Sequence, residues 1–265
     1  MPRVRKYLRS VPPGILEEDC IVTSLLLHRP FNVASTGVPS DFCQPVNLAR
    51  NFKKIAAFSR DQNVSVVNMS WGDDLHEFEE WLARTKEGED PDQRKREAMK
   101  LFEIWRQAIV DTIKTAPNTL FVTAAGNSDS DASFLQDIPA SLELPNLITV
   151  GGTNRAGDPT TFTSYGKTVI VYAHGFHVAS YIPGGKIVRF SGTSMASPAV
   201  TNLAAKLFAI DPWLTPEQAR TLIVDGSTTS ENGSRKLVDE NGAIKLARIN
   251  KEKARGDASS SRSDR

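Results

Sequence analysis

Nine residues from Phe190 to Pro198 form a run of mostly small and hydroxylated side chains, Phe190-Ser191-Gly192-Thr193-Ser194-Met195-Ala196-Ser197-Pro198. The segment before it, residues 186–190, alternates polar and apolar side chains as a half-buried strand does, and apolar residues after it recur at helical spacing. A serine at such a junction stands at a helix N-terminus, where free backbone N–H groups and the helix dipole stabilise a developing negative charge. The pattern indicates a nucleophilic serine, with an N-cap serine in a plain strand–helix turn as the alternative.

Small and polar side chains also follow two other strand-like runs. Residues 64–69 lead into Ser70-Trp71-Gly72, and residues 119–123 lead into Ala124-Ala125-Gly126-Asn127. With the serine run, these segments resemble, in the same order, the motifs of the subtilisin-like serine peptidases (peptidase S8, the subtilases). The resemblance extends from about residue 19 to about residue 250 and includes Ile138-Pro139-Ala140-Ser141, Ile148-Thr149-Val150-Gly151 and Phe162-Thr163-Ser164-Tyr165-Gly166.

The resemblance implies a serine endopeptidase that hydrolyses peptide bonds of proteins or peptides through an acyl-enzyme. Ser194 would be the nucleophile, and its backbone N–H and the side-chain amide of Asn127 would form the oxyanion hole. The two residues are 194 − 127 = 67 positions apart, close to the spacing in the family. By the same resemblance, the pocket for the side chain before the scissile bond would be lined by Ser70, Trp71, Gly72, Ala124, Ala125 and Gly126, with Trp71 narrowing it.

The general base of this family is not found in the sequence. Relatives carry a catalytic Asp in an Asp-[Ser/Thr]-Gly motif and a His in a His-Gly-Thr-His motif, both before the strand matched here by residues 19–27. Neither motif is present, and Asp19 and Asp41 lack the surrounding residues. Removing the base costs roughly a factor of 10⁶ in kcat, a value measured in a subtilisin of the same family. The chain is therefore expected to be weakly active or inactive alone.

The sequence contains four histidines that could act as a substitute base. His174-Gly175-Phe176-His177 imitates the family's His motif, but His177 lies only 17 residues before Ser194, on the connection that leads to it. His28 lies at the end of a predicted strand, and it is not followed by a helix, whereas the catalytic His of the family opens one. His76 belongs to a charged segment and is expected to be solvated. None of the four fits the role.

Three interpretations fit an intact serine segment without its base. The preferred one is a fragment of a longer peptidase that lacks the N-terminal part. The others are a chain that pairs with a separate chain supplying Asp and His, and a non-catalytic peptide-binding or regulatory module with a subtilase fold. In the family the strand that carries the Asp lies inside the parallel sheet and not at its edge, so its absence would leave the neighbouring strands with unpaired backbone groups.

The strand–helix–strand order predicts an α/β fold, a subtilisin-like parallel sheet with helices on both faces but without its N-terminal strands. Residues 1–18 are interpreted as an irregular lead-in, residues 19–250 as a partial peptidase domain and residues 251–265 as a disordered tail. The expected elements are strands at 19–27, 64–69, 119–124, 147–150 and 168–172 and helices at 46–60, 215–224 and 241–250. A charged helical insertion at about 73–117, with apolar stripes at helical spacing, is expected to border the substrate cleft.

The composition of the chain limits the classes of partner that can be expected. The net charge of +1 gives no reason to expect nucleic acid or an anionic membrane. No apolar run is long enough to span a bilayer. The N-terminus is basic, but the apolar segment of a signal peptide does not follow it, so the sequence does not indicate a compartment, although relatives are mostly secreted. Cys20 and Cys43 define no disulfide framework or metal site. No cofactor is expected. Calcium is common in the family, but no site is assigned, because Asp129, Asp131 and Asp137 are interpreted as a solvated loop.

Overall fold

The computed structural model describes residues 24–28, 32–36, 45–85, 90–181, 185–231 and 233–263. The strands are β1 (Ser24–His28), β2 (Asn32–Thr36), β3 (Val64–Met69), β4 (Leu120–Ala124), β5 (Leu147–Thr153), β6 (Val169–His174), β7 (Val178–Tyr181), β8 (Ile187–Phe190), β9 (Thr228–Thr229) and β10 (Lys236–Leu237). The helices are α1 (Pro45–Asp61), α2 (Leu75–Thr85), α3 (Pro91–Thr115), α4 (Ala132–Leu135), α5 (Thr193–Ile210), α6 (Pro216–Gly226) and α7 (Glu240–Ser263). The lead-in expected at residues 1–18, both cysteines, Asp19 and Asp41 lie outside the described residues.

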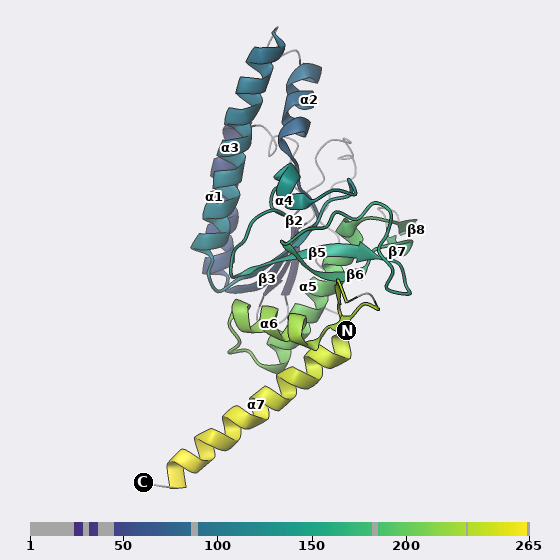
Figure 1. Ribbon diagram of the computed structural model, residues 1–265. Coiled ribbons are helices and arrows are strands. Elements are labelled where there is room, and N and C mark those ends of the chain that lie inside the picture. The colour runs from purple at the N-terminus through teal and green to yellow at the C-terminus, as the bar shows by residue number, and fades with distance from the viewer. Residues whose placement is uncertain are drawn as a thin grey trace.

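The main sheet has the strand order β2-β1-β3-β4-β5-β6-β10-β9, and its centre from β3 to β10 is parallel (Figure 1). This confirms the predicted α/β class. The edge beside β3 differs from the expected open gap, because β1 pairs with β3 in an antiparallel register that includes Leu26 opposite Val67. β1 also pairs antiparallel with β2, so the strand that feeds α1 and runs parallel to β3 is β2. The crossover through α1 skips one strand and leaves β1 between the parallel pair.

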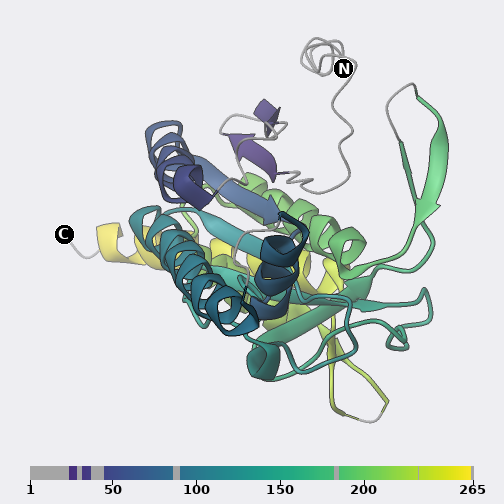
Figure 2. The ribbon, with the colours of Figure 1, turned by 90° about the horizontal axis from the view of Figure 1, so that it is seen from above.

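Helices cover both faces of the sheet, as predicted (Figures 1 and 2). On one face α5, α6 and α7 pack on inward-facing residues of the parallel strands, such as Val122, Ile148 and Val171. On the other face α1 and α3 pack on residues such as Val67 and Phe121. Strands covered on both faces are buried throughout, which explains why β3, β4 and β5 appear in the sequence as nearly continuous apolar runs.

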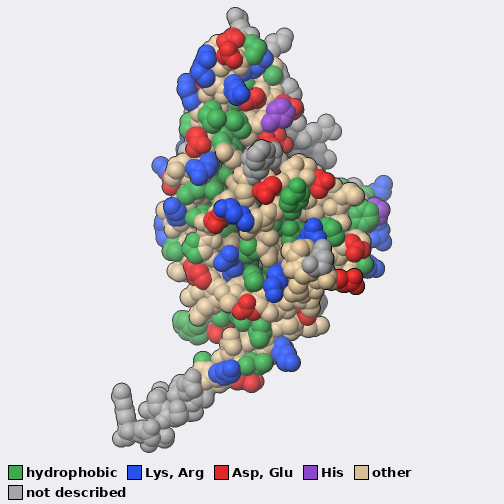
Figure 3. All heavy atoms as spheres, viewed as in Figure 1, with side chains coloured by type: hydrophobic (Ala, Val, Ile, Leu, Met, Phe, Trp, Pro, Cys, Tyr) green, Lys and Arg blue, Asp and Glu red, His purple; other side chains and the backbone are tan. Residues whose placement is uncertain are grey.

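The charged insertion forms two helices that extend beyond the sheet beside α1 (Figure 1). The apolar stripe predicted for its second half is buried on α3, from Ala98 to Ile113. Phe78 of α2 packs edge-on against Phe102 at a centroid distance of 5.9 Å and against Trp105 at 5.4 Å. Figure 3 shows basic and acidic side chains interspersed over these helices, as expected for solvated faces.

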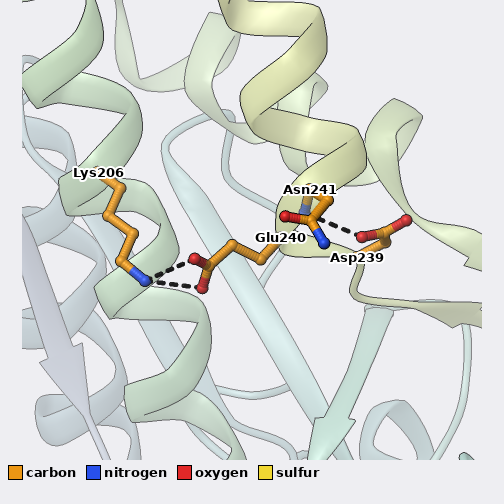
Figure 4. A network of polar contacts seen from close by, with 4 residues as sticks. All are labelled: Lys206, Asp239, Glu240 and Asn241. Atoms are coloured by element: carbon orange, nitrogen blue, oxygen red, sulfur yellow. Dashed lines mark hydrogen bonds and ion pairs between the residues drawn. The ribbon is translucent and has the colours of Figure 1, made fainter.

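The C-terminal helices cross closely. The predicted capping box of Thr215 and Gln218 starts α6. Asp239 caps α7 by accepting the backbone N–H of Asn241 at 2.9 Å, and Lys206 of α5 donates to both carboxylate oxygens of Glu240 at 2.7 Å (Figure 4). Glycine is required at the crossing, because a Cβ at Gly226 would lie 2.3 Å from the backbone nitrogen of Ala243.

Two expectations about the outer elements were wrong. The last helix does not end near residue 250 with a disordered tail after it, because α7 continues to Ser263 and extends away from the body (Figure 1). Once its first turns are capped and packed, adding residues costs little because each contributes a backbone hydrogen bond. Residues 187–190 alternate like a half-buried strand, but among the described strands β8 pairs with β7 alone. The two form a hairpin that projects from the body and leaves β8 mostly exposed (Figure 2).

Candidate active site

Ser194 is the second residue of α5 and is half-buried, so the structure places it at a helix N-terminus as predicted. The turn before it is fixed by backbone hydrogen bonds. Gly192 donates to the carbonyl of Gly175 at 2.8 Å, and Met195 donates to the carbonyl of Gly192 at 2.9 Å. Glycine is required where these segments approach, because a Cβ at Gly175 would lie 2.7 Å from the Gly192 oxygen. In the first turn of α5, the N–H groups of Thr193 and Met195 are hydrogen-bonded, which leaves the N–H of Ser194 without a hydrogen-bond partner among the described residues.

Asn127 lies just beyond β4, and its side chain reaches the same helix start. Its Oδ1 accepts hydrogen bonds from the backbone N–H of Thr193 at 2.8 Å and from the Thr193 hydroxyl at 3.1 Å. The Thr193 hydroxyl also lies 3.2 Å from the carbonyl of Gly126. Because Oδ1 is occupied, the amide is oriented, and Nδ2 has no hydrogen-bond partner among the described residues. Asn127 and Ser194, which are 67 positions apart in the sequence, thus line the same pocket.

Ser70, at the end of β3, ties the sheet to α5. Its hydroxyl accepts a hydrogen bond from Asn68 Nδ2 at 2.8 Å, donates to the Ser194 carbonyl at 2.9 Å and lies 2.9 Å from the Ser197 hydroxyl. The Ser194 hydroxyl in turn donates to the carbonyl of Ser70 at 3.3 Å. This network fixes the nucleophile candidate against the sheet.

A pocket of about 330 Å³ opens beside Ser194. It is lined by Trp71, Gly72, Asp74, Glu77, Ala124, Gly126, Asn127, Ser128, Asp137, Thr193 and Ser194. Four of the six predicted wall residues are among these. The other two are not: Ser70 belongs to the network above, and Ala125 is fully buried in a small apolar cluster behind the wall.

Trp71 is held in the pocket wall by aromatic packing. Its ring lies 5.7 Å from Phe52 of α1 and 6.0 Å from Trp105 of α3, measured between centroids. The insertion therefore supports one wall of the pocket through α3, and Asp74 and Glu77 bring its start to the rim.

Asp137 corrects the interpretation of its loop as solvated. Paired backbone hydrogen bonds between Asp73 and Ile138, of 3.0 and 3.1 Å, hold the loop under the end of β3. Burial, together with the negative charges of Glu77 and Asp74, raises the pKa of Asp137 to about 7. The sequence signal was its position directly before Ile138-Pro139, a segment already matched to the family.

The neighbouring carboxyls are also linked. Burial raises the pKa of Asp73 to about 8, with contributions from a hydrogen bond to Glu77 and from the charges of Glu77, Asp137 and Asp74. Asp74 and Glu77 form a capping box at the start of α2: the backbone N–H of Glu77 donates to Asp74 Oδ1 at 3.0 Å, and the backbone N–H of Asp74 donates to Glu77 Oε2 at 3.3 Å.

In the described part of the chain, no group of three or more His, Cys, Asp or Glu side chains is arranged to hold a metal ion.

None of the histidines with a described side chain hydrogen-bonds to Ser194. His174 ends β6, and its buried Nδ1 has no partner in the described chain. His177 is exposed and stacks on Phe176 at 4.1 Å, and His76 lies 3.2 Å from Glu80. The side chain of His28 lies outside the described part.

Among the helices that the structure describes, none could cross a membrane.

Comparison with known proteins agrees with this arrangement. The sequence profile of the subtilase family, Peptidase_S8, matches residues 33–244. The chain is 37% identical over 107 residues to the subtilisin-like serine protease Pen ch 13 of Penicillium rubens, covering 40% of this chain and 26% of that protein. It is 30% identical over 122 residues to the subtilisin of Bacillus pumilus, covering 46% of this chain and 44% of that protein. The matches thus span less than half the length of these relatives.

The fold is also similar to that of a cold-adapted subtilisin-like serine proteinase. The TM-score is 0.53 and the sequence identity 24%, over 77% of this chain and 63% of the other. With the family profile matching most of the sequence, this chain belongs to the subtilase family of serine peptidases.

Proposed function

We propose that this chain provides the nucleophile, the oxyanion hole and the substrate pocket of a subtilisin-type serine endopeptidase. The observation that carries the proposal is the double hydrogen bond from Thr193 to Asn127 Oδ1, at 2.8 and 3.1 Å. It orients the free Nδ2 of Asn127 beside the first turn of α5, where Ser194 contributes its own backbone N–H. Two donors and a hydroxyl then converge at the mouth of the pocket.

In this proposal the Ser194 Oγ attacks the carbonyl carbon of the scissile peptide bond. The oxyanion accepts hydrogen bonds from the Ser194 N–H and Asn127 Nδ2, the leaving amine takes a proton, and water then hydrolyses the acyl ester. The hydroxyl proton must pass to a base, which we place outside the side chains that the structure describes, either elsewhere in the full-length protein or on a second chain. Without it, an oxyanion hole and cleft leave a rate about 10³ to 10⁴ above water, as measured in a subtilisin of this family.

A fluorophosphonate probe followed by peptide mapping tests the nucleophile. Slow labelling of Ser194 that is absent in Ser194→Ala is expected. Labelling at rates typical of an intact serine peptidase would show that the chain contains its own base, and absence of any Ser194 adduct after prolonged incubation would contradict the proposal. Peptide mapping is needed because exposed serines can react slowly.

A non-catalytic peptide-binding module is the second candidate. It is favoured by one observation, the hydrogen bond from the Ser194 hydroxyl to the Ser70 carbonyl at 3.3 Å, which turns the hydroxyl toward the sheet. Peptide binding that is unchanged in Ser194→Ala, combined with no acylation even when the N-terminal part of a relative's catalytic domain is added in trans, would favour this candidate.

A further inference from the structure

We infer that the pocket beside Ser194 binds a basic side chain, arginine or lysine, immediately before the scissile bond, with Asp137 as the residue that determines this specificity. The inference rests on the proposed function, because it assigns the substrate class of the same pocket. The inference goes beyond the proposed function because the pocket walls predicted from the sequence, which combine Trp71 with small residues, favour no charged substrate side chain.

Asp137 lies between the two walls of the pocket. A Cβ built on Gly72 would lie 2.7 Å from Asp137 Oδ1, and one built on Gly126 would lie 2.4 Å from Oδ2. Both walls carry glycine where the carboxylate lies, and a larger side chain at either position would displace the carboxylate from this place. Gly126 also has φ of 98°, which L side chains rarely adopt, so that wall is restricted to glycine for two reasons.

Among the described residues, the Asp137 carboxylate has no partner that would explain its position. Oδ1 is buried and has no hydrogen-bond partner within the described residues. Asp131, a few residues earlier, shows the ordinary structural use of such a side chain, since its Oδ1 accepts the backbone N–H of Ser133 at 2.8 Å. Burying an ionised carboxylate without a partner is costly, and a cationic ligand would remove that cost.

The surrounding charges have the same sign. Asp74 and Glu77 line the pocket with Asp137, Asp73 adjoins them, and no Lys, Arg or His is among the lining residues. Burial and these carboxylates hold the pKa of Asp137 at about 7, so the pocket disfavours further negative charge. A guanidinium or ammonium group on a long apolar stem fits both the acidic interior and the Trp71 wall.

Binding of product-like peptides tests this without requiring turnover. Acetylated tetrapeptides that end in arginine, lysine, norleucine or phenylalanine would be titrated into the whole chain at about pH 8, where the carboxyl ionises readily. Trp71 in the pocket wall provides a fluorescence signal, with calorimetry as the independent readout. The arginine and lysine peptides are expected to bind at least about 30-fold more tightly than norleucine, as for a buried charge pair.

Two variants complete the test. Asp137→Asn, which keeps the shape, is expected to abolish the preference, whereas Asp129→Asn removes an exposed charge from the same loop and should leave it intact. Equal or tighter binding of norleucine or phenylalanine, selectivity that survives Asp137→Asn, or no binding of any peptide at millimolar concentration would overturn the inference. Basic selectivity without any fluorophosphonate adduct on Ser194 would instead support the pocket and contradict the catalytic proposal.

Discussion

Asn127 and Thr193 are joined by two hydrogen bonds, both to the same oxygen of the Asn127 side chain. The amide is thereby fixed in one orientation, with its donor directed away from Thr193. The proposed oxyanion hole therefore depends on the nitrogen of Asn127, while the oxygen only positions it. Mutation can separate the role of the nitrogen as a donor from the role of the oxygen in positioning the side chain.

Asn127→Asp keeps the acceptor oxygen for Thr193 but removes the donor, and Asn127→Ala removes both. Acylation of Ser194 is expected to fall about 10² to 10³-fold in each variant, a magnitude known from the equivalent change in a subtilisin of this family. Rates of ester acylation by mass spectrometry measure it. If the side chain only braced the helix, Asn127→Asp would acylate like the unmodified chain. Melting temperatures provide the control, because Asn127 is exposed and both variants should fold.

Ser70→Ala is expected to destabilise the protein by about 1 to 3 kcal/mol, because it leaves Asn68 Nδ2 and the Ser194 carbonyl without their partner. Ser59→Ala is the matched control. Ser59 is also buried, but its hydroxyl has no hydrogen-bond partner in the described chain, so its removal should be neutral or slightly stabilising. Urea unfolding of both variants measures the difference. Equal losses would mean that the serine network does not hold α5 to the sheet.

Stability should fall as pH rises from about 4 to about 8. The pKa of Asp137 is raised from 3.8 to about 7 and that of Asp73 to about 8, mainly by burial. Between these values the unfolded chain has ionised both carboxyls while the native protein keeps its protons, so the native state binds more protons and loses stability with increasing pH. Below about pH 4 both states are protonated, and above about pH 8 both are ionised, so the dependence flattens at each end.

Asp137→Asn isolates the contribution of one carboxyl to that slope. The variant is expected to match the unmodified chain near pH 4 and to be more stable by about 2 to 4 kcal/mol near pH 8, because it buries no charge. Urea unfolding across this range measures it. A slope unchanged by the substitution would show that Asp137 titrates normally in the native state.

Selectivity for arginine over norleucine at the pocket should increase from about pH 6 to about pH 8, because the arginine stays charged while Asp137 loses its proton. Asp73, Asp74 and Glu77, from the β3 end and α2, oppose this ionisation, while Gly72 and Gly126 contribute no charge. Peptide titrations at several pH values give the ratio of Kd values. In Asp137→Asn the ratio should be small and nearly independent of pH. A ratio that fell with pH in the unmodified chain would contradict the assignment.

Local sequence patterns predicted the elements that position the site. The apolar stripe of α3, the capping box of α6 and the buried strands β3, β4 and β5 depend on residue types within one or two turns, so they could be recognised in isolation. That Asn127 would lie at the start of α5, where it contacts Thr193 beside Ser194, was predicted only through the resemblance of ordered motifs. No local pattern specifies a contact between residues so far apart.

The features that were missed depend on long-range contacts. Asp137 looks like any polar loop residue until the bridge between Asp73 and Ile138 places it under the pocket. The alternation of residues 187–190 is that of a half-buried strand, yet the side chains of β8 are mostly exposed in the structure. The antiparallel pairing of β1 with β3 likewise follows from which strand feeds α1, which hydrophobic runs alone do not determine.

Acylation by a peptide ester that ends in arginine tests the central claim most directly. The chain would be incubated with the p-nitrophenyl ester, stopped in acid and mapped by mass spectrometry beside Ser194→Ala and Asn127→Asp. The account predicts one adduct on Ser194, formed faster with the arginine ester than with the norleucine ester, slowed in Asn127→Asp and absent in Ser194→Ala. An adduct on another residue, or acylation equally fast in all three proteins, would contradict it.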